Sequence, residues 1–429
     1  MEIKSNVKLI GEIRVPGDKS ISHRSIILGA IGVGRTEVSN ILFSEDTLRT
    51  IECFKAMGVE IEACEGENRV IVHGVGLHGL KKPIKPLDCG NSGTTMRLIS
   101  GILLGQKFSS TVYGDDSLNN RPMSRIIIPL RLMGGNISGQ ADKFPPLNIN
   151  PTTELHGINY RLPVASAQVK SSILLASLYS NGATNIKEEK VTRDHTERML
   201  DYFGANIEYS SKDICLKEKS HLIGKDIFVP GDISSAAFFI VAASILKGSS
   251  IVIKDVGLNP SRTGIIKVLK SMGASIEIYN QRSLNNEEYG DIKVIYQALK
   301  GISLEGNIIG TLIDEIPIIA VAAAFAHGKT IIRNAEELKH KETDRIKAIA
   351  MELRKMGCNI EELEDGLIIY GDQELKGTTL SSHNDHRIAM ALTVAALNSS
   401  GNSKIRDSQC VNISYPNFYS DLENYTVNI

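Results

Sequence analysis

The chain has 429 residues, a formal net charge of −1 and 23% charged residues. This length is too great for one ordinary hydrophobic core and predicts two or three domains. Because the charges balance, no bulk attraction for a nucleic acid or a membrane surface is expected, and any attraction for anions must come from locally gathered cations.

The first segment, "MEIKSNVKLIGEIRV", alternates apolar and polar residues, which predicts a strand rather than a signal or transit peptide. No apolar run approaches the roughly 20 residues that a membrane-spanning helix needs, so we expect a cytoplasmic protein with no membrane partner. The cysteines include no CxxC pair, which favours reduced core thiols over disulfides or a zinc site. They are Cys53, Cys64, Cys89, Cys215, Cys358 and Cys410.

A repeat organises the chain from one end to the other. An amphipathic helical pattern, a helix-ending glycine and a short alternating strand recur about every 70 residues. The recurring segments are "MGVEIE" (57–62), "MGGNIS" (133–138), "FGANIE" (203–208), "MGASIE" (272–277) and "MGCNIE" (356–361). Together they predict a repeated supersecondary unit.

A second helix precedes each amphipathic one and is apolar on nearly all faces, which predicts that it is buried. These helices read "SHRSIILGAI", "GTTMRLISGILL", "AQVKSSILLASL", "SSAAFFIVAASI", "EIPIIAVAAAFA" and "DHRIAMALTVAAL". With the strands between them, the unit is βαβαββ, repeated six times with a divergent last copy. The fold class is therefore α/β.

Six such units predict two domains of three units each. The sequence "VPGD" occurs at Val15–Asp18 and again at Val229–Asp232, and only the first copy is followed by Lys19, His23 and Arg24. The strand before the first copy cannot stand unpaired, so it is assigned to the second domain. The predicted domains are 15–231 and 1–14 plus 232–429, with hinges at the two VPGD turns and a ligand cleft between the lobes.

The loops before the buried helices collect Gly, Ser, Asp and basic residues. Helix N-termini attract anions, and clustered cations add to that attraction. Taken singly, each signal has an ordinary structural reading, because a Ser or Asp there is usually a cap and a Lys or Arg usually a solvated face. Nine cations nevertheless lie beside these loops: Lys19, Arg24, Arg97, Arg121, Lys170, Arg193, Lys341, Arg345 and Arg387.

Seven motifs stand in one order across essentially the whole chain: "PGDKSISHR", "GNSGTTMR", "RPMSR", "SAQVKS", "DEIP", "KETDR" and "NDHR". This set resembles the 5-enolpyruvylshikimate-3-phosphate synthase family. The resemblance implies a two-lobed inside-out α/β fold with three βαβαββ units in each lobe. It also implies transfer of the enolpyruvyl group of phosphoenolpyruvate to the 5-hydroxyl of shikimate 3-phosphate, with release of phosphate on the way to chorismate and aromatic amino acids.

The resemblance further implies a monomer with no metal, no organic cofactor and no nucleic-acid partner. The residues that it implies for shikimate 3-phosphate are Lys19, Ser20, Arg24, Ser166, Gln168, Arg193, Asp314 and Lys341. Those that it implies for phosphoenolpyruvate are Lys19, Asn91, Gly93, Thr94, Arg121, Gln168, Arg345 and Arg387. The catalytic candidates are Lys19, Asp314, Lys341, Glu342 and His386.

The reaction is an addition followed by an elimination, and it needs one base and one acid. Asp314 is the candidate base for the hydroxyl proton, and Lys19 with Glu342 would serve the enol methylene and the leaving phosphate. The sequence leaves open how the candidates share these proton transfers. For His386, a helix-start histidine that holds its neighbours is an equal alternative.

Two positions depart from the best-known family pattern. Ala167 stands where many members have serine, which together with "TRDHTER" resembles the second sequence class of the family. Ile413 stands where some members have lysine, which puts one phosphoenolpyruvate contact in doubt. Gly93 leaves room where tolerant members have a methyl group, so we expect glyphosate to compete with phosphoenolpyruvate, at most moderately.

The sequence also bears on three alternative functions. The sister enzyme that acts on UDP-N-acetylglucosamine uses a cysteine in the loop that corresponds roughly to 111–121, and "TVYGDDSLNNR" has none. For an RNA 3′-terminal phosphate cyclase-like protein, the neutral charge and the lack of basic patches interleaved with aromatics argue against RNA. A module that only binds phosphorylated sugars would not keep Asp314, Lys341 and Glu342 together.

Overall fold

The computed structural model describes residues 1–428, which form two compact units. The N-unit comprises residues 17–229 and 284–287, and the C-unit comprises 1–16, 230–283 and the chain from 288 onward. Relative to the predicted domains, residues 15–16 and 230–231 belong to the C-unit, and the hairpin tip 284–287 belongs to the N-unit. Neither VPGD turn therefore lies wholly within one unit.

The N-unit contains three repeats, each with one four-stranded sheet. The first has α1 (Lys19–Ile31), β3 (Val33–Ser39), α2 (Glu45–Ala56), β4 (Glu60–Cys64), η1 (Glu65–Glu67), β5 (Arg69–Val75) and β14 (Ile227–Phe228). The second has β6 (Leu87–Asp88), α3 (Gly93–Leu103), β7 (Ser110–Tyr113), α4 (Asp116–Asn119), α5 (Ser124–Leu132), β8 (Asn136–Gln140) and β9 (Phe144–Asn150). The third has β10 (Asn159–Arg161), α6 (Ala167–Ser177), β11 (Thr184–Lys187), α7 (His195–Tyr202), β12 (Ile207–Tyr209) and β13 (Asp213–Leu216).

The C-unit contains the other three repeats. The fourth has β2 (Val7–Ile13), α8 (Ile233–Ile245), β15 (Ser250–Gly257), α9 (Gly264–Ser271), β16 (Ser275–Leu284) and β17 (Glu287–Ile295). The fifth has β18 (Ser303–Leu304), η2 (Gly306–Thr311), η3 (Ile313–Glu315), α10 (Ile316–Ala324), β19 (Lys329–Ile332), η4 (Glu336–His340), α11 (Arg345–Lys355), β20 (Ile360–Leu363) and β21 (Gly366–Tyr370). The sixth has β22 (Thr379–Ser381), α12 (His386–Leu397), β23 (Ser403–Arg406), η5 (Ser408–Ile413), α13 (Phe418–Tyr425), β24 (Thr426–Asn428) and β1 (Glu2–Ile3).

The sheets share one topology in which the first strand is parallel to the strand after the buried helix, and an antiparallel hairpin completes the sheet. The order is β14-β3-β5-β4 in the first repeat and β10-β11-β13-β12 in the third. The sixth repeat diverges as predicted, because it has only the three-stranded sheet β1-β23-β22 and gives β24 to the sheet of β2. The six-repeat α/β prediction is confirmed.

Two first strands are exchanged along the chain. Strand β2 precedes the first VPGD turn but pairs in parallel with β15 of the fourth repeat. Strand β14 precedes the second VPGD turn but pairs in parallel with β3 of the first repeat. Each turn therefore leads from the first strand of one repeat into the helix of another, which gives the otherwise lone N-terminal strand its partner.

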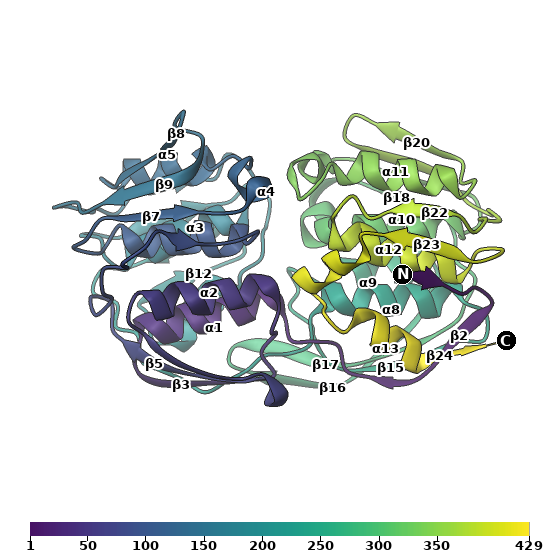
Figure 1. Ribbon diagram of the computed structural model, residues 1–429, viewed down its shortest axis with the longest axis horizontal. Coiled ribbons are helices and arrows are strands. Elements are labelled where there is room, and N and C mark those ends of the chain that lie inside the picture. Colours follow the sequence, from purple (N-terminus) through teal and green to yellow (C-terminus); the bar gives the residue numbers. More distant parts are fainter. Residues whose placement is uncertain (429) are drawn as a thin grey trace. The chain divides into compact units, whose positions relative to one another are not determined.

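The apolar helices form the core of each unit, as predicted. Every residue of α8 and α12 is buried, and α8, α10 and α12 pack against one another. In the N-unit α3 packs against α6, and Figure 1 shows α1 and α2 side by side next to β3 and β5. Within residues 1–428, no helix has both the length and the apolar character needed to cross a membrane. All six cysteines are free thiols, of which Cys64 and Cys215 are half-buried and the others buried.

Candidate active site

Lys19 is the first residue of α1 in the N-unit. Asp18 caps this helix by accepting a hydrogen bond from the Ile21 amide at 2.9 Å. The Lys19 Nζ lies 2.5 Å from an oxygen of Asp46, and the lysine side chain keeps 18% of its surface exposed. Ser20 follows and is half-buried. The helix start thus holds a partly accessible ammonium beside a carboxylate.

Arg24 lies one turn further along α1 and is buried. Its Nε donates to Thr196 at 2.6 Å, its Nη2 to Ser171 at 2.8 Å and its Nη1 to the Ser20 carbonyl at 2.9 Å. Because Ser171 belongs to α6 and Thr196 to α7, this guanidinium joins the first and third repeats of the N-unit.

His23 belongs to a buried chain of hydroxyl groups rather than to an accessible surface. Its Nδ1 lies 2.7 Å from Thr50 Oγ1, which lies 2.7 Å from Thr95 Oγ1, which donates to Ser92 at 2.7 Å. The chain connects α1 and α2 to the cap of α3. Burial, together with the positive charges of Lys19 and Arg24, holds the pKa of His23 well below its ordinary value.

The pKa of His23 predicts how stability depends on pH. The unfolded chain binds a proton below about pH 6.5 that the folded chain excludes, so the free energy of unfolding falls by up to about 1.4 kcal/mol per pH unit below that value. Above it this contribution is constant. His23→Asn, which retains a polar group near Thr50, should flatten the slope in denaturant unfolding between pH 5 and 7. The same change at exposed His221 should leave the slope intact; an unchanged slope in His23→Asn would contradict the assignment.

Five of the six N-unit residues implied for phosphoenolpyruvate, all but Lys19, come together around the start of α3. Asn91 accepts from Arg121 Nη2 at 2.7 Å and donates to Asp115 at 2.8 Å. Gln168, at the start of α6, donates to Thr94 Oγ1 at 3.0 Å. Five predicted positions from two repeats therefore meet at two neighbouring helix N-termini: Asn91, Gly93, Thr94, Arg121 and Gln168.

Gly93 lies beside two guanidinium groups. A Cβ at this position would be 3.1 Å from Arg97 Nη1 and 3.6 Å from Arg121 Nη1. Arg97 also donates to the Gln168 side-chain oxygen. Two arginines beside a helix N-terminus form a suitable cradle for a planar or tetrahedral oxyanion. The sequence placed Arg97 beside the loops but assigned it no role; its position four residues after Gly93, on the same helix face, is the signal that could have found it.

Ser166 and Arg193 occupy the third repeat. Ser166 caps α6 by accepting from the Val169 amide at 3.4 Å, so its ordinary structural reading holds. Arg193 is half-buried in the loop 188–194 between β11 and α7. The N-unit therefore contains all of the predicted residues that precede 230.

Arg345 is the centre of the candidate group in the C-unit. It is 1% exposed, and each of its three nitrogens donates to a different carboxylate: Nε to Asp385 at 2.8 Å, Nη1 to Asp314 at 3.0 Å and Nη2 to Glu342 at 2.6 Å. Burial alone would lower the pKa of Arg345, but these three charges outweigh it and raise the pKa above its ordinary value. The guanidinium stays charged and holds the carboxylates in place.

Lys341 adds a second cation to this group, with its Nζ 3.1 Å from the same Asp314 oxygen that Arg345 contacts. Asp314 lies in η3, directly before buried helix α10. Two cations and three carboxylates give a net negative group, which differs from the expected gathering of cations alone.

His386 and Arg387 begin α12. Asp385 caps this helix by accepting from the Arg387 amide at 2.8 Å, and His386 is buried. Arg387 Nη1 lies 4.0 Å from Glu315, and within residues 1–428 the buried Arg387 Nε has no hydrogen-bond partner. The burial of His386 at a helix start leaves both of its interpretations open.

The departure at position 413 also has a structural context. Ile413 ends η5 and packs, half-buried, against the core of the C-unit. The next side chain, Ser414, is buried, and its hydroxyl has no hydrogen-bond partner within residues 1–428. An apolar side chain therefore occupies a core position where some family members have a lysine.

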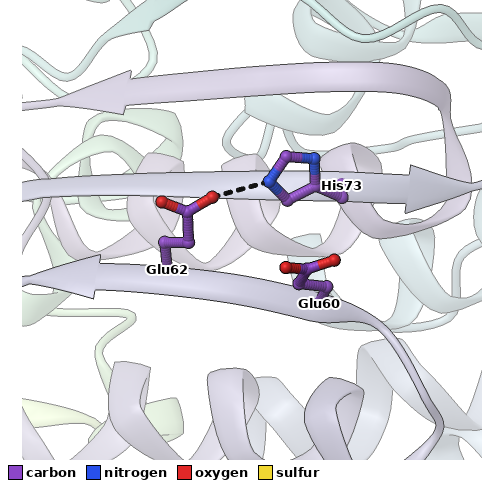
Figure 2. A group of neighbouring side chains, drawn as sticks. All are labelled: Glu60, Glu62 and His73. Carbon is purple, nitrogen blue, oxygen red and sulfur yellow. Dashed lines mark hydrogen bonds and ion pairs between the residues drawn. The ribbon is translucent and has the colours of Figure 1, made fainter.

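A different cluster lies on an exposed face of the N-unit. Glu60 and Glu62 of β4 and His73 of β5 place one possible ligand atom each within 4.8 Å of one another, and Figure 2 shows the imidazole directed at Glu62, 2.8 Å away. Both glutamates are exposed, and exposed acidic groups are common without an ion. Among the described residues no second feature at this face points to a metal, so we assign none.

The comparisons agree with one another. The family model described as EPSP synthase (3-phosphoshikimate 1-carboxyvinyltransferase) matches residues 3–422. The chain is 53% identical to a 3-phosphoshikimate 1-carboxyvinyltransferase of Thermoanaerobacter sp. over 423 residues, 99% of each protein, and 51% identical to one of Oceanobacillus iheyensis over 416 residues, 97% of this chain and 96% of that protein. A solved EPSP synthase of Acinetobacter baumannii matches with a TM-score of 0.89 at 45% identity, covering 99% of this chain and 97% of the other. On the family model and on near-complete matches at about half identity, the chain belongs to the EPSP synthase (3-phosphoshikimate 1-carboxyvinyltransferase) family of shikimate-pathway enzymes.

Proposed function

We propose that this chain carries out its family's reaction, the transfer of an enolpyruvyl group from phosphoenolpyruvate to the 5-hydroxyl of shikimate 3-phosphate with release of phosphate, using one residue group from each unit. The observation that carries the residue assignment is the pair of guanidinium groups near Gly93 at the start of α3. The sister enzyme acting on UDP-N-acetylglucosamine and the RNA cyclase-like protein are not favoured, because the family model and the relatives at about half identity are 3-phosphoshikimate 1-carboxyvinyltransferases.

In this proposal the N-unit residues around Gly93 bind phosphoenolpyruvate. Arg121 is held by Asn91, and Gln168 is held by Thr94 and Arg97, so these groups are fixed before substrate arrives. Preorganised donors are worth more than mobile ones because no ordering cost falls on the binding step. Arg345 and Arg387 complete the phosphoenolpyruvate set from the C-unit, with Arg345 acting mainly by holding its carboxylates.

Shikimate 3-phosphate is bound by residues at the starts of α1 and α6 and in the loop before α7. These are Lys19, Ser20, Arg24, Ser166, Gln168 and Arg193, with Asp314 and Lys341 from the C-unit. Arginine suits the planar and tetrahedral oxyanions of this substrate, while the compact Lys19 ammonium can also pass a proton to phosphoenolpyruvate.

Proton transfer falls to the net negative group of the C-unit and to Lys19. Asp314 removes the proton of the attacking hydroxyl, and its carboxylate is oriented by Lys341 and Arg345 at 3.1 and 3.0 Å. Glu342 and Lys19 serve the enol methylene and the leaving phosphate, with His386 a further candidate. The steps balance: the hydroxyl oxygen bonds to the enol carbon and the bond from that carbon to the phosphate oxygen breaks, while the methylene gains one proton and returns one. The proton taken from the hydroxyl by the base is passed to the departing phosphate.

The test is phosphate release by the purified chain with phosphoenolpyruvate, shikimate 3-phosphate or both. Release only when both are present supports the proposal. Release that requires UDP-N-acetylglucosamine, or turnover that requires a nucleotide and RNA, would replace it with one of the alternatives. We further propose a cytoplasmic monomer that binds no nucleic acid, which sedimentation and fractionation would check.

Gly93→Ala tests the phosphoenolpyruvate cradle. The added methyl group would lie 3.1 Å from Arg97 Nη1, so the arginine must shift by a few tenths of an ångström and the space between the guanidinium groups shrinks. We expect the KM for phosphoenolpyruvate to rise about tenfold, in the range of one misplaced methyl group. The KM for shikimate 3-phosphate should rise less, since Gly93 is not in that set and reaches it only through Gln168, which accepts a hydrogen bond from Arg97.

The same pair of proteins tests glyphosate. We expect glyphosate to compete with phosphoenolpyruvate in the wild type and to inhibit Gly93→Ala less. Gly66→Ala, at an exposed N-unit glycine whose added Cβ would meet nothing within 4 Å and whose φ is not in the left-handed region, is the control for a glycine-to-alanine change away from the site. Equal phosphoenolpyruvate KM values in wild type and Gly93→Ala would remove Gly93 from the cradle.

A further inference from the structure

Lys170 is the fourth residue of α6 but does not join the accessible cations that the sequence gathers beside the helix starts. Its Nζ lies 2.9 Å from Glu188 Oε2 and 2.6 Å from Glu197 Oε1, and the three side chains are 1%, 1% and 2% exposed. A buried ammonium that bridges two buried carboxylates contacts no solvent-facing ligand. Any role that it has in the reaction must act through the residues that it holds.

The two carboxylates bracket one loop. Glu188 is the first residue after β11, and Glu197 lies in the first turn of α7, so Lys170 fixes both ends of the loop 188–194. Inside the loop, Thr192 donates to Glu188 Oε1 at 2.5 Å, and Asp194 accepts from Arg198 Nε at 2.8 Å. Arg193 stands between these two anchored residues.

The contacts between α6 and α7 also hold Arg24. Two adjacent contacts join α6 to α7. Lys170 pairs with Glu197, and the Ser171 hydroxyl lies 2.6 Å from the Thr196 hydroxyl. Arg24 donates to both of these hydroxyl groups. The alignment of α6 with α7 therefore sets the positions of Arg24 and Arg193 together.

The charges of this group explain why it holds firmly. Burial alone would lower the pKa of Lys170, but the charges of Glu197 and Glu188 raise it above its ordinary value. Burial raises the pKa of Glu197, and its second oxygen has no hydrogen-bond partner within residues 1–428. Losing the ammonium would leave two buried carboxylates facing each other, a costly state that the loop could relieve only by moving.

We propose that Lys170 is a positioning residue that holds Arg24 and Arg193 in place to bind shikimate 3-phosphate. The inference rests on the proposed function of those two arginines. Most N-unit residues proposed for phosphoenolpyruvate, such as Asn91 and Arg121, belong to the second repeat. Gln168 lies on α6, but its side chain is held by Thr94 and Arg97 of α3. The role therefore predicts a change confined largely to one substrate.

The test compares Lys170→Met with the triple variant Lys170→Met/Glu188→Gln/Glu197→Gln. The single variant leaves two buried carboxylates and is open to misfolding, whereas the triple variant removes all three charges and keeps an acceptor for Thr192. Lys187→Met is the matched control, because this lysine ends β11 with its side chain exposed. Phosphate release is measured against each substrate in turn, and thermal unfolding checks that each variant is folded.

We expect the triple variant to be folded and its KM for shikimate 3-phosphate to rise about tenfold or more, with the KM for phosphoenolpyruvate within about twofold and Lys187→Met unchanged. A folded triple variant with the wild-type KM for shikimate 3-phosphate overturns the proposal. So does an equal rise in both KM values, or a rise in the control, because either would mark a general structural role. A wild type that releases no phosphate from the two substrates instead refutes the proposed function.

Discussion

Replacing Lys19 with alanine should lower kcat about a thousandfold while the protein stays folded. The variant loses the one cation at the start of α1 that keeps accessible surface, with 18% of its side chain exposed, and with it both an anion contact and a proton donor. Removing one preorganised charged group, or one general acid, costs about 10²- to 10⁴-fold in rate. Turnover is measured by phosphate release at saturating concentrations of both substrates.

The fold should tolerate this change because the charge left behind is compensated. Asp46, the partner of Lys19, lies in the first turn of α2, where the helix N-terminus favours a negative charge. We expect a loss of about 1–2 kcal/mol in the free energy of unfolding, between the values for exposed and buried pairs. The control is Lys55→Ala, which removes an exposed lysine 3.6 Å from Glu52 and should affect neither quantity. Ordinary turnover by Lys19→Ala would refute this site.

The sequence predicted the repeat because each copy carries the same hydrophobic pattern, and that pattern has a direct physical consequence. A helix that is apolar on all faces can lie only inside the fold, and α8 and α12 are buried along their whole length. The pairing of β2 with a distant strand also followed from elementary chemistry, since an unpaired strand leaves its backbone groups unsatisfied. The transfer of the hairpin tip 284–287 to the other unit carried no such signal, because it depends on which surface the tip contacts.

The candidate site was predicted in part. Motif positions brought Asn91, Thr94 and Gln168 to one place because each lies at a helix start of the same unit, and Arg121, in the loop between α4 and α5, joins them by donating to Asn91. The ion-pair partners of the basic residues could not be predicted from motif positions. On a helix buried all round, periodicity does not indicate which direction a residue faces, so Lys170 looked like the accessible cations although Glu188 and Glu197 enclose it.

Arg345 illustrates the same limit. Its partner Asp385 is 40 residues away and caps a helix of the next repeat, so only the packing of α11 against α12 joins them. The sequence indicated a cation for an anionic substrate, and the structure encloses that cation in carboxylates. Arg345 therefore orients carboxylates, and Asp314, the candidate base, is one of them.

Asp314→Asn should leave the protein folded and lower kcat about 10²- to 10⁴-fold, the usual loss when a general base is removed. The amide oxygen can still accept from Arg345 Nη1 and Lys341 Nζ, which lie 3.0 and 3.1 Å from the carboxylate oxygen. Arg345 also keeps Asp385 and Glu342, so the buried guanidinium remains paired. Stability should therefore change by no more than about 1 kcal/mol.

The KM for shikimate 3-phosphate distinguishes a role of Asp314 as the base from a role in binding alone. The substitution removes one negative charge near the site of an anionic substrate, so the KM for shikimate 3-phosphate should not rise, and kcat alone should fall. Glu362→Gln, which alters an exposed pair with Arg354 in the same repeat, is the control and should match the wild type. A kcat for Asp314→Asn within about threefold of the wild type, or a rise in KM alone, would show that Asp314 is not the base. The hydroxyl proton would then have to pass to another group, and Glu342 and His386 would be the next candidates.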